Sequence, residues 1–79
     1  MRIKILGTGC PNCRTLEKNV KTAVSELAID VDIAKIEDIM EIMTYNVVKT
    51  PGLVLDEQVV SWGKVLTVDQ VKEIISKKQ

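Results

Sequence analysis

The chain has 79 residues, 46% apolar and 28% charged, which fits one globular domain over residues 1–79 that is too small for a deep pocket. Eleven basic and eleven acidic residues give a formal net charge of zero, so we expect no nucleic acid as a partner. The chain has no histidine, which excludes imidazole bases and histidine-ligated zinc and leaves the two cysteines as the source of any covalent chemistry.

Residues 2–6 alternate between two faces and predict a first strand. Ile3 and Ile5 should lie on one face of this strand, and Lys4 and Leu6 on the other. A Gly-Thr-Gly segment follows directly and should end the strand in a tight loop.

From Pro11 the spacing of apolar residues changes to the 3.6-residue period of a helix, which should run to Leu27. Glu17 and Lys21 are four residues apart on its polar face and should form an ion pair. The predicted apolar stripe comprises Cys13, Leu16, Val20, Val24 and Leu27.

Residues 31–36 alternate again and predict a second strand, which a helix separates from the first. Such a strand–helix–strand unit makes the two strands a parallel pair. Asp38 should then open a short helix that ends near residues 45–46. Four carboxylates in this region form a mildly acidic patch, expected to be a solvated surface: Asp30, Asp32, Glu37 and Asp38.

Residues 53–55 and 59–61 predict an antiparallel hairpin with a turn at 56–58. Thr67 and Gln70 have the spacing of a capping box, so a final helix should begin directly after Thr67. The predicted order of elements is β-α-β-α-β-β-α.

Cys10 and Cys13 stand at the junction between the first strand and the first helix. The unpaired N–H groups of a helix N-terminus stabilise a thiolate, so Cys10 is the candidate nucleophile. Cys13 lies one turn later in the apolar stripe and is the candidate resolving thiol, which attacks the Cys10 sulfur in a mixed disulfide. Two intervening residues in a first helical turn keep the sulfurs within bonding range.

Cysteine usage and hydropathy together predict the compartment. One four-residue loop between cysteines adds little stability to a secreted domain, and the N-terminus lacks the apolar run of a signal peptide. No apolar run is long enough to span a membrane. We therefore expect a cytoplasmic protein in a reducing compartment, with no membrane partner.

Over essentially its whole length the sequence resembles the small thioredoxin-like proteins, a compact branch of the thioredoxin and glutaredoxin families. The resemblance rests on Cys10-Pro11-Asn12-Cys13 after a strand, Thr50-Pro51 before the hairpin, Gly63 after it, and a closing helix. It implies a minimal thioredoxin-like fold of the α/β class, with a four-stranded mixed sheet and three helices.

The resemblance also implies a function, that of a thiol–disulfide oxidoreductase whose Cys10–Cys13 dithiol exchanges with protein disulfides and which uses no cofactor. In the family, the proline before the third strand is cis and lies against the sulfurs, and Pro51 stands in the matching place. The implied partners are a protein disulfide and an upstream reductase, and we expect a monomer. The residues expected to contact the substrate are Gly9, Pro11, Asn12, Thr50, Pro51 and Gly63.

Two lysines stand at positions of interest in the family. Lys4 falls where thioredoxins carry a buried acid, and Lys35 resembles the lysine that pairs with that acid. Long aliphatic stems let lysines reach solvent easily, so we expect both to be ordinary strand-edge or solvent-facing residues without a catalytic role.

An alternative function uses the same two cysteines to bind or transfer a soft metal ion such as Cu(I). Heavy-metal-associated domains have a similar length and also place a Cys-x-x-Cys in the first strand–helix loop. Their motif begins with a methionine where this chain has Thr8, their fold ends in a strand, and they do not require Thr50-Pro51. A zinc site would need two further ligands, from a second copy. The redox function is therefore favoured.

Overall fold

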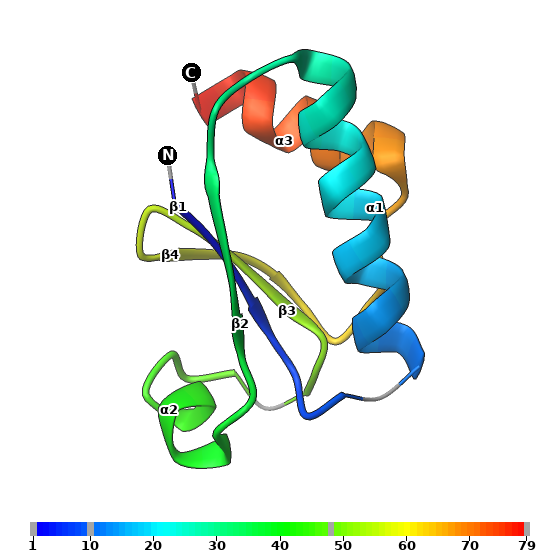
Figure 1. Cartoon of the computed structure of the whole chain (residues 1–79). Coiled ribbons are helices and arrows are strands. Elements are labelled where there is room, and N and C mark those ends of the chain that lie inside the picture. The colour runs from blue at the N-terminus through cyan, green and yellow to red at the C-terminus, as the bar shows by residue number, and fades with distance from the viewer. Residues whose placement is uncertain (1, 10, 48, 79) are drawn as a thin grey trace.

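The computed structural model describes residues 2–9, 11–47 and 49–78, and its elements follow one another in the predicted order (Figure 1). The strands are β1 (Arg2–Leu6), β2 (Asp32–Ile36), β3 (Gly52–Leu55) and β4 (Gln58–Trp62). The helices are α1 (Pro11–Leu27), α2 (Ile39–Met43) and α3 (Val68–Lys78). The predicted α/β class, with a four-stranded mixed sheet and three helices, is confirmed.

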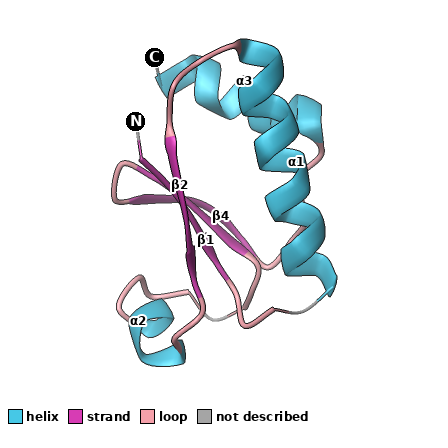
Figure 2. Ribbon diagram, viewed as in Figure 1, coloured by secondary structure: helices cyan, strands magenta, loops and turns pink. Residues whose placement is uncertain are grey.

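The sheet has the strand order β2-β1-β3-β4, so β1 lies inside it with a neighbour on each side (Figure 2). β1 is parallel to β2 and antiparallel to β3, and β3 is antiparallel to β4. The parallel pair is connected through the long α1 crossover, whereas a short turn is enough for the antiparallel pair. The expected parallel pair and the expected hairpin are both confirmed.

Helices cover both faces of the sheet: α1 and α3 pack on one face, and α2 lies on the other (Figure 1). The larger buried cluster, under α1 and α3, contains Ile3, Ile5, Leu16, Val20, Ala23, Leu53, Leu55, Leu66, Val71 and Ile75. The smaller cluster, under α2, contains Leu6, Ile42, Val47 and Val54. Full burial of one such aliphatic side chain contributes about 1.5–3 kcal/mol, so the α1–α3 side supplies most of the stabilisation.

The apolar face of α1 differs in part from the predicted stripe. The helix buries Cys13, Leu16, Val20 and Ala23, whereas Val24 and Leu27 are only partly buried. Ala23 and Val24 lie on opposite margins of the stripe, about 100° apart on the helix. α3 packs against α1, and Ala23 belongs to the same buried cluster as Val71 and Ile75 of α3.

The hairpin is tighter than predicted. Its turn consists of Asp56 and Glu57, whose φ angles are 48° and 70°, and Gln58 already pairs with Leu55 as the first residue of β4. The expected three-residue turn at 56–58 is therefore wrong. Two-residue turns with positive φ at both positions have a twist that matches the flanking strands, which explains the shorter loop.

Two helices begin at capping residues that the sequence indicated. The Thr67 N–H donates to Gln70 Oε1 at 2.9 Å, and the Gln70 N–H donates to Thr67 Oγ1 at 3.2 Å. This reciprocal pair is the predicted capping box. Asp38 caps α2, with its carboxylate accepting from the Met40 N–H at 2.9 Å.

Candidate active site

The loop between β1 and α1, which we call the cysteine loop, lies at one end of the sheet and leads into the first turn of α1 (Figure 1). Cys10 lies outside the described residues, so its assignment as the nucleophile stays a prediction. Cys13 stands in the first turn of α1, is 6% exposed, and is disulfide-bonded. No acidic residue occupies that first turn, so nothing within it offsets the partial positive charge of the helix N-terminus. Such a setting stabilises a thiolate.

Gly7 packs directly against Cys13, although the sequence suggested only that it ends a strand. Gly7 is buried, and its N–H donates to the Ile36 carbonyl at 2.9 Å. A Cβ built on Gly7 would lie 2.3 Å from Cys13 Sγ and 4.0 Å from Thr50 Cβ. Only a residue without a side chain therefore fits between the Cys13 sulfur and the loop that leads to β3. The sequence pattern around Gly7 could not predict this contact, because the packing of α1 brings Cys13 to Gly7.

Pro51 and Gly63, two of the residues expected to contact a substrate, are joined by a hydrogen bond. The Gly63 N–H donates to the Pro51 carbonyl at 2.9 Å, and Pro51 is fully buried. The Thr50–Pro51 peptide bond is cis. Gly63 has a φ of 77°, and a Cβ there would lie 3.3 Å from Lys49 Cβ, so glycine suits this position on both counts. The pairing of β3 with β4 thus brings Gly63 to Pro51.

The other expected contact residues surround the cysteine loop with different exposures. Pro11 and Asn12 are exposed in the first turn of α1, and Gly9 and Thr50 are half-buried. Gly9 has a φ of 88° with no atom near its missing side chain, which identifies it as a turn residue. That any of these residues contacts a substrate stays a prediction.

Lys4 does not lie at a strand edge, so that part of the expectation is wrong, whereas its lack of a catalytic role stays a prediction. It lies on the inner strand β1, where its ammonium donates to Tyr45 Oη at 2.9 Å and pairs with Glu57. The hydrogen bond to Glu57, followed by the bond to Tyr45, raises the pKa of Lys4 above its ordinary value of 10.5. Lys4 therefore ties the segment after α2 to the β3–β4 turn.

Lys35 is exposed on the edge strand β2, as expected, and contacts Glu17 and Glu37 at 3.5 and 3.7 Å. Glu17 also contacts Lys21 at 3.3 Å, which confirms the predicted pair. Lys35 is in register with Ile5, whose neighbour Lys4 points to the opposite face of the sheet. The two lysines consequently share no partner.

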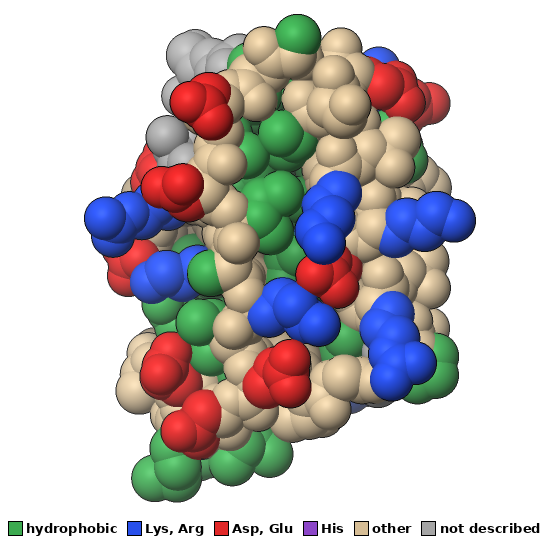
Figure 3. All heavy atoms as spheres, viewed as in Figure 1, with side chains coloured by type: hydrophobic (Ala, Val, Ile, Leu, Met, Phe, Trp, Pro, Cys, Tyr) green, Lys and Arg blue, Asp and Glu red, His purple; other side chains and the backbone are tan. Residues whose placement is uncertain are grey.

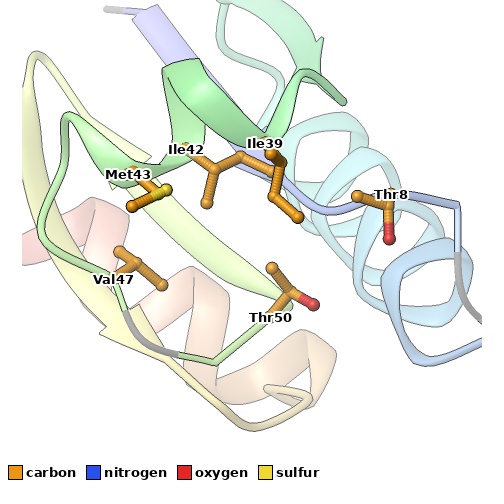
Figure 4. A pocket seen from close by; sticks show the side chains of 6 residues that line it. All are labelled: Thr8, Ile39, Ile42, Met43, Val47 and Thr50. Atoms are coloured by element: carbon orange, nitrogen blue, oxygen red, sulfur yellow. The ribbon is translucent and has the colours of Figure 1, made fainter.

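An open apolar groove lies beside the cysteine loop, and we call it the α2 groove. It has a volume of about 430 Å³ and is lined by Thr8, Ile39, Ile42, Met43, Val47 and Thr50 (Figure 4). The apolar spacing of Ile39, Ile42 and Met43 was visible in the sequence. Their position beside Thr50 was not, because it depends on where α2 packs.

The described part of the chain has neither a metal-binding cluster nor a membrane-spanning helix. It holds no group of three or more Cys, Asp and Glu side chains placed to bind a metal ion. None of its helices has the length and hydropathy needed to cross a membrane.

The known proteins that this chain resembles are thioredoxins. The thioredoxin domain family matches residues 1–76. A thioredoxin from Methanothermobacter thermautotrophicus is 41% identical over 76 residues, which cover 96% of this chain and 99% of the relative. A thioredoxin from Methanocaldococcus jannaschii is 46% identical over 71 residues, which cover 90% of this chain and 81% of the relative.

Proposed function

Because the chain belongs to the thioredoxin family of protein disulfide oxidoreductases, we propose that it reduces protein disulfides through a mixed disulfide on Cys10. The observation that carries the proposal is Cys13, which is buried and disulfide-bonded in the first turn of α1. The same turn presents the unpaired N–H groups that favour a thiolate.

The exchange proceeds in two balanced steps. The Cys10 thiolate attacks one sulfur of the target disulfide, the target S–S bond breaks, and the second target cysteine leaves as a thiolate. Cys13, as a thiolate, then attacks the Cys10 sulfur, forms the Cys10–Cys13 bond and releases the first target cysteine. The target gains two electrons and two protons, and the chain is left oxidised.

A target segment would lie across the end of the sheet where the cysteine loop meets Pro51. We assign contacts with it to Gly9, Pro11, Asn12, Thr50, Pro51 and Gly63. The hydrogen bond between Pro51 and Gly63 and the contact of Gly7 with Cys13 support this assignment, because they bring three segments of the chain to one place. A shallow surface of this kind suits exchange with a disulfide exposed on another protein.

The two cysteines themselves carry the electrons, so the proposal requires no bound cofactor. It does require an upstream reductase that returns the pair to the dithiol, and we further propose that the chain acts as a monomer in a reducing compartment such as the cytoplasm. The alternative of soft-metal binding finds no support in the comparisons, which lead to thioredoxins.

Reduction of insulin tests the mechanism with the wild-type chain and the variants Cys10→Ser and Cys13→Ser. We expect turnover only in the wild type, and a trapped mixed disulfide with the target only in Cys13→Ser. Equal residual activity in all three proteins would overturn the proposal. Trapping by Cys10→Ser instead would reverse the two roles.

A further inference from the structure

Two methionines stand on α2, and both expose their side chains to solvent. Met40 is 70% exposed and Met43 is 62% exposed. Apolar side chains project from the end of the molecule where α2 lies (Figure 1, Figure 3). An accessible thioether is open to oxidation by a hydroperoxide, which converts the methionine into its sulfoxide. Both residues are therefore candidate oxidation sites.

The two methionines differ in what their side chains border. Met43 lines the α2 groove together with Ile42 and Val47 (Figure 4). Met40 is not among the described residues that line this groove, although it is the more exposed of the two. Oxidation of Met43 would therefore change the wall of the groove, whereas oxidation of Met40 would leave the wall unaltered.

Two threonines connect the α2 groove to the candidate active site. Thr8 and Thr50 both line the groove; Thr8 lies in the cysteine loop, and the cis peptide bond follows Thr50. A Cβ on Gly7 would lie 4.0 Å from Thr50 Cβ and 2.3 Å from Cys13 Sγ. A protein whose disulfide reaches the cysteine sulfurs therefore lies close to the groove wall that contains Met43.

We propose that Met43 is an oxidation site through which a hydroperoxide lowers the activity of the chain toward protein disulfides. This inference rests on the proposed function and adds a regulation of the same site. The hydroperoxide transfers one oxygen atom to the Met43 sulfur, so that its O–O bond breaks and an S–O bond forms. The thioether loses two electrons, and hydrogen peroxide is reduced to water. The cysteine pair takes no part in this step.

The sulfoxide makes part of the groove wall polar. Apart from the two threonines, the described side chains that line the groove with Met43 are apolar: Ile39, Ile42 and Val47. A protein surface that covers the sulfoxide removes water from its oxygen, and this loss costs affinity unless a hydrogen bond replaces it. A small disulfide reaches the sulfurs without covering the groove, so oxidation should affect protein substrates selectively. Enzymes that reduce methionine sulfoxides would reverse the change.

Peroxide treatment of the full-length chain tests the inference with two substrates. The chain is treated as its disulfide, which leaves no free cysteine thiol to oxidise, and is then freed of peroxide and reduced. We expect kcat/KM for insulin to fall about fivefold or more, and kcat/KM for bis(2-hydroxyethyl) disulfide to change less than about twofold. Mass spectrometry of proteolytic peptides measures the sulfoxide at Met43. An equal loss on both substrates, or no loss on insulin after complete oxidation of Met43, would overturn the inference.

Met43→Leu and Met40→Leu form a matched pair, because each removes one thioether from α2 and keeps an apolar side chain of similar volume. After peroxide treatment, Met40→Leu should lose insulin reduction as the wild type does, whereas Met43→Leu should retain its untreated rate. Both variants keep Met1, so an effect of that residue would appear in both. A loss in Met43→Leu as large as that in the wild type would refute the assignment.

Untreated proteins separate this inference from the proposed function. Reduction of insulin by the untreated wild type, with no effect of peroxide, would refute the oxidation site alone. Inactivity of the untreated wild type on both substrates would refute the proposed function, and the inference with it. Met43→Gln adds a measurement without oxidant, because it places a polar group at the same position. It should reduce insulin more slowly than Met40→Gln, and equal rates would contradict the inference.

Discussion

The missing side chain of Gly7 leaves the space that the sulfur of Cys13 occupies. A Cβ there would lie 2.3 Å from Cys13 Sγ and 2.9 Å from Cys13 Cβ. Gly7 has little freedom to retreat, because its N–H donates to the Ile36 carbonyl at the end of the parallel strand pair. Any side chain at this position must therefore displace the sulfur.

Gly7→Ala should slow the release of the target from its mixed disulfide. Displacement of a reacting atom by about an ångström can cost up to about 100-fold in rate, and we expect at least about tenfold. Single-turnover kinetics with a peptide disulfide measure this step. Gly52→Ala is the control, because the three nearest atoms to its new methyl group all belong to Leu6, at 3.2 to 3.5 Å, and none belongs to a cysteine.

The contact between Gly7 and Cys13 predicts that substitutions at these two residues have non-additive effects on the free energy of unfolding. Gly7→Ala should lower the free energy of unfolding by about 1–3 kcal/mol through overpacking. In a Cys13→Ala background the closer of the two contacts, with the sulfur, is gone and only the contact with the Cβ at 2.9 Å remains, so the cost of Gly7→Ala should fall. Urea denaturation of the four proteins, all fully reduced, measures the coupling. Additive effects would show that the contact does not limit the packing.

Lys4→Met should remove a pH-dependent contribution to stability. The pKa of Lys4 is raised by its hydrogen bonds to Glu57 and then Tyr45, so pairing stabilises the fold fully at pH values below the unfolded value of about 10.5. The contribution is lost as the pH rises through the folded-state pKa. The difference in urea midpoint between the wild type and Lys4→Met should accordingly be largest near pH 8 and shrink above pH ~10.5.

Lys21→Met is the control for that experiment, because Lys21 is an exposed lysine on α1 whose pair with Glu17 is worth at most about 0.5 kcal/mol. A difference between the wild type and Lys4→Met that stays constant from pH 8 to beyond pH ~10.5 would contradict the assigned linkage.

Thr67→Ala should destabilise the chain by about 1 kcal/mol, because it removes the hydroxyl that accepts from the Gln70 N–H. Thr15→Ala is a matched substitution inside α1, where the hydroxyl only donates to the Pro11 carbonyl, and alanine favours helix. The melting temperature of Thr67→Ala should therefore be lower than that of Thr15→Ala. Equal melting temperatures would show that the capping box contributes no stability.

Ala23→Leu should cost about 1–3 kcal/mol, since the added atoms must enter the contact between α1 and α3. Val24→Leu, one residue later on the partly exposed margin, should cost less than about 1.5 kcal/mol. Chemical denaturation of both variants checks which margin is covered. A larger loss for Val24→Leu would favour the stripe expected from periodicity.

Local patterns were sufficient to predict the order of elements, the capping box and the Cys-x-x-Cys at the start of α1. Each of these depends on residues within about one helical turn or on alternation along one strand. Thr67 and Gln70 form their bonds to each other, for example, whatever else the chain packs against. The resemblance of these motifs to thioredoxins also led to the family that the comparisons show.

Only the tertiary structure decided the contacts between residues that are distant in the sequence. The strand order placed β1 inside the sheet, which made Lys4 a partner of Tyr45 and Glu57 instead of an edge lysine. The packing of α1 on that sheet set the Cys13 sulfur against Gly7. Neither contact can be predicted from the periodicity of the sequence. Each joins segments that are far apart in the chain, and these segments come together only when the helices pack on both faces of the sheet.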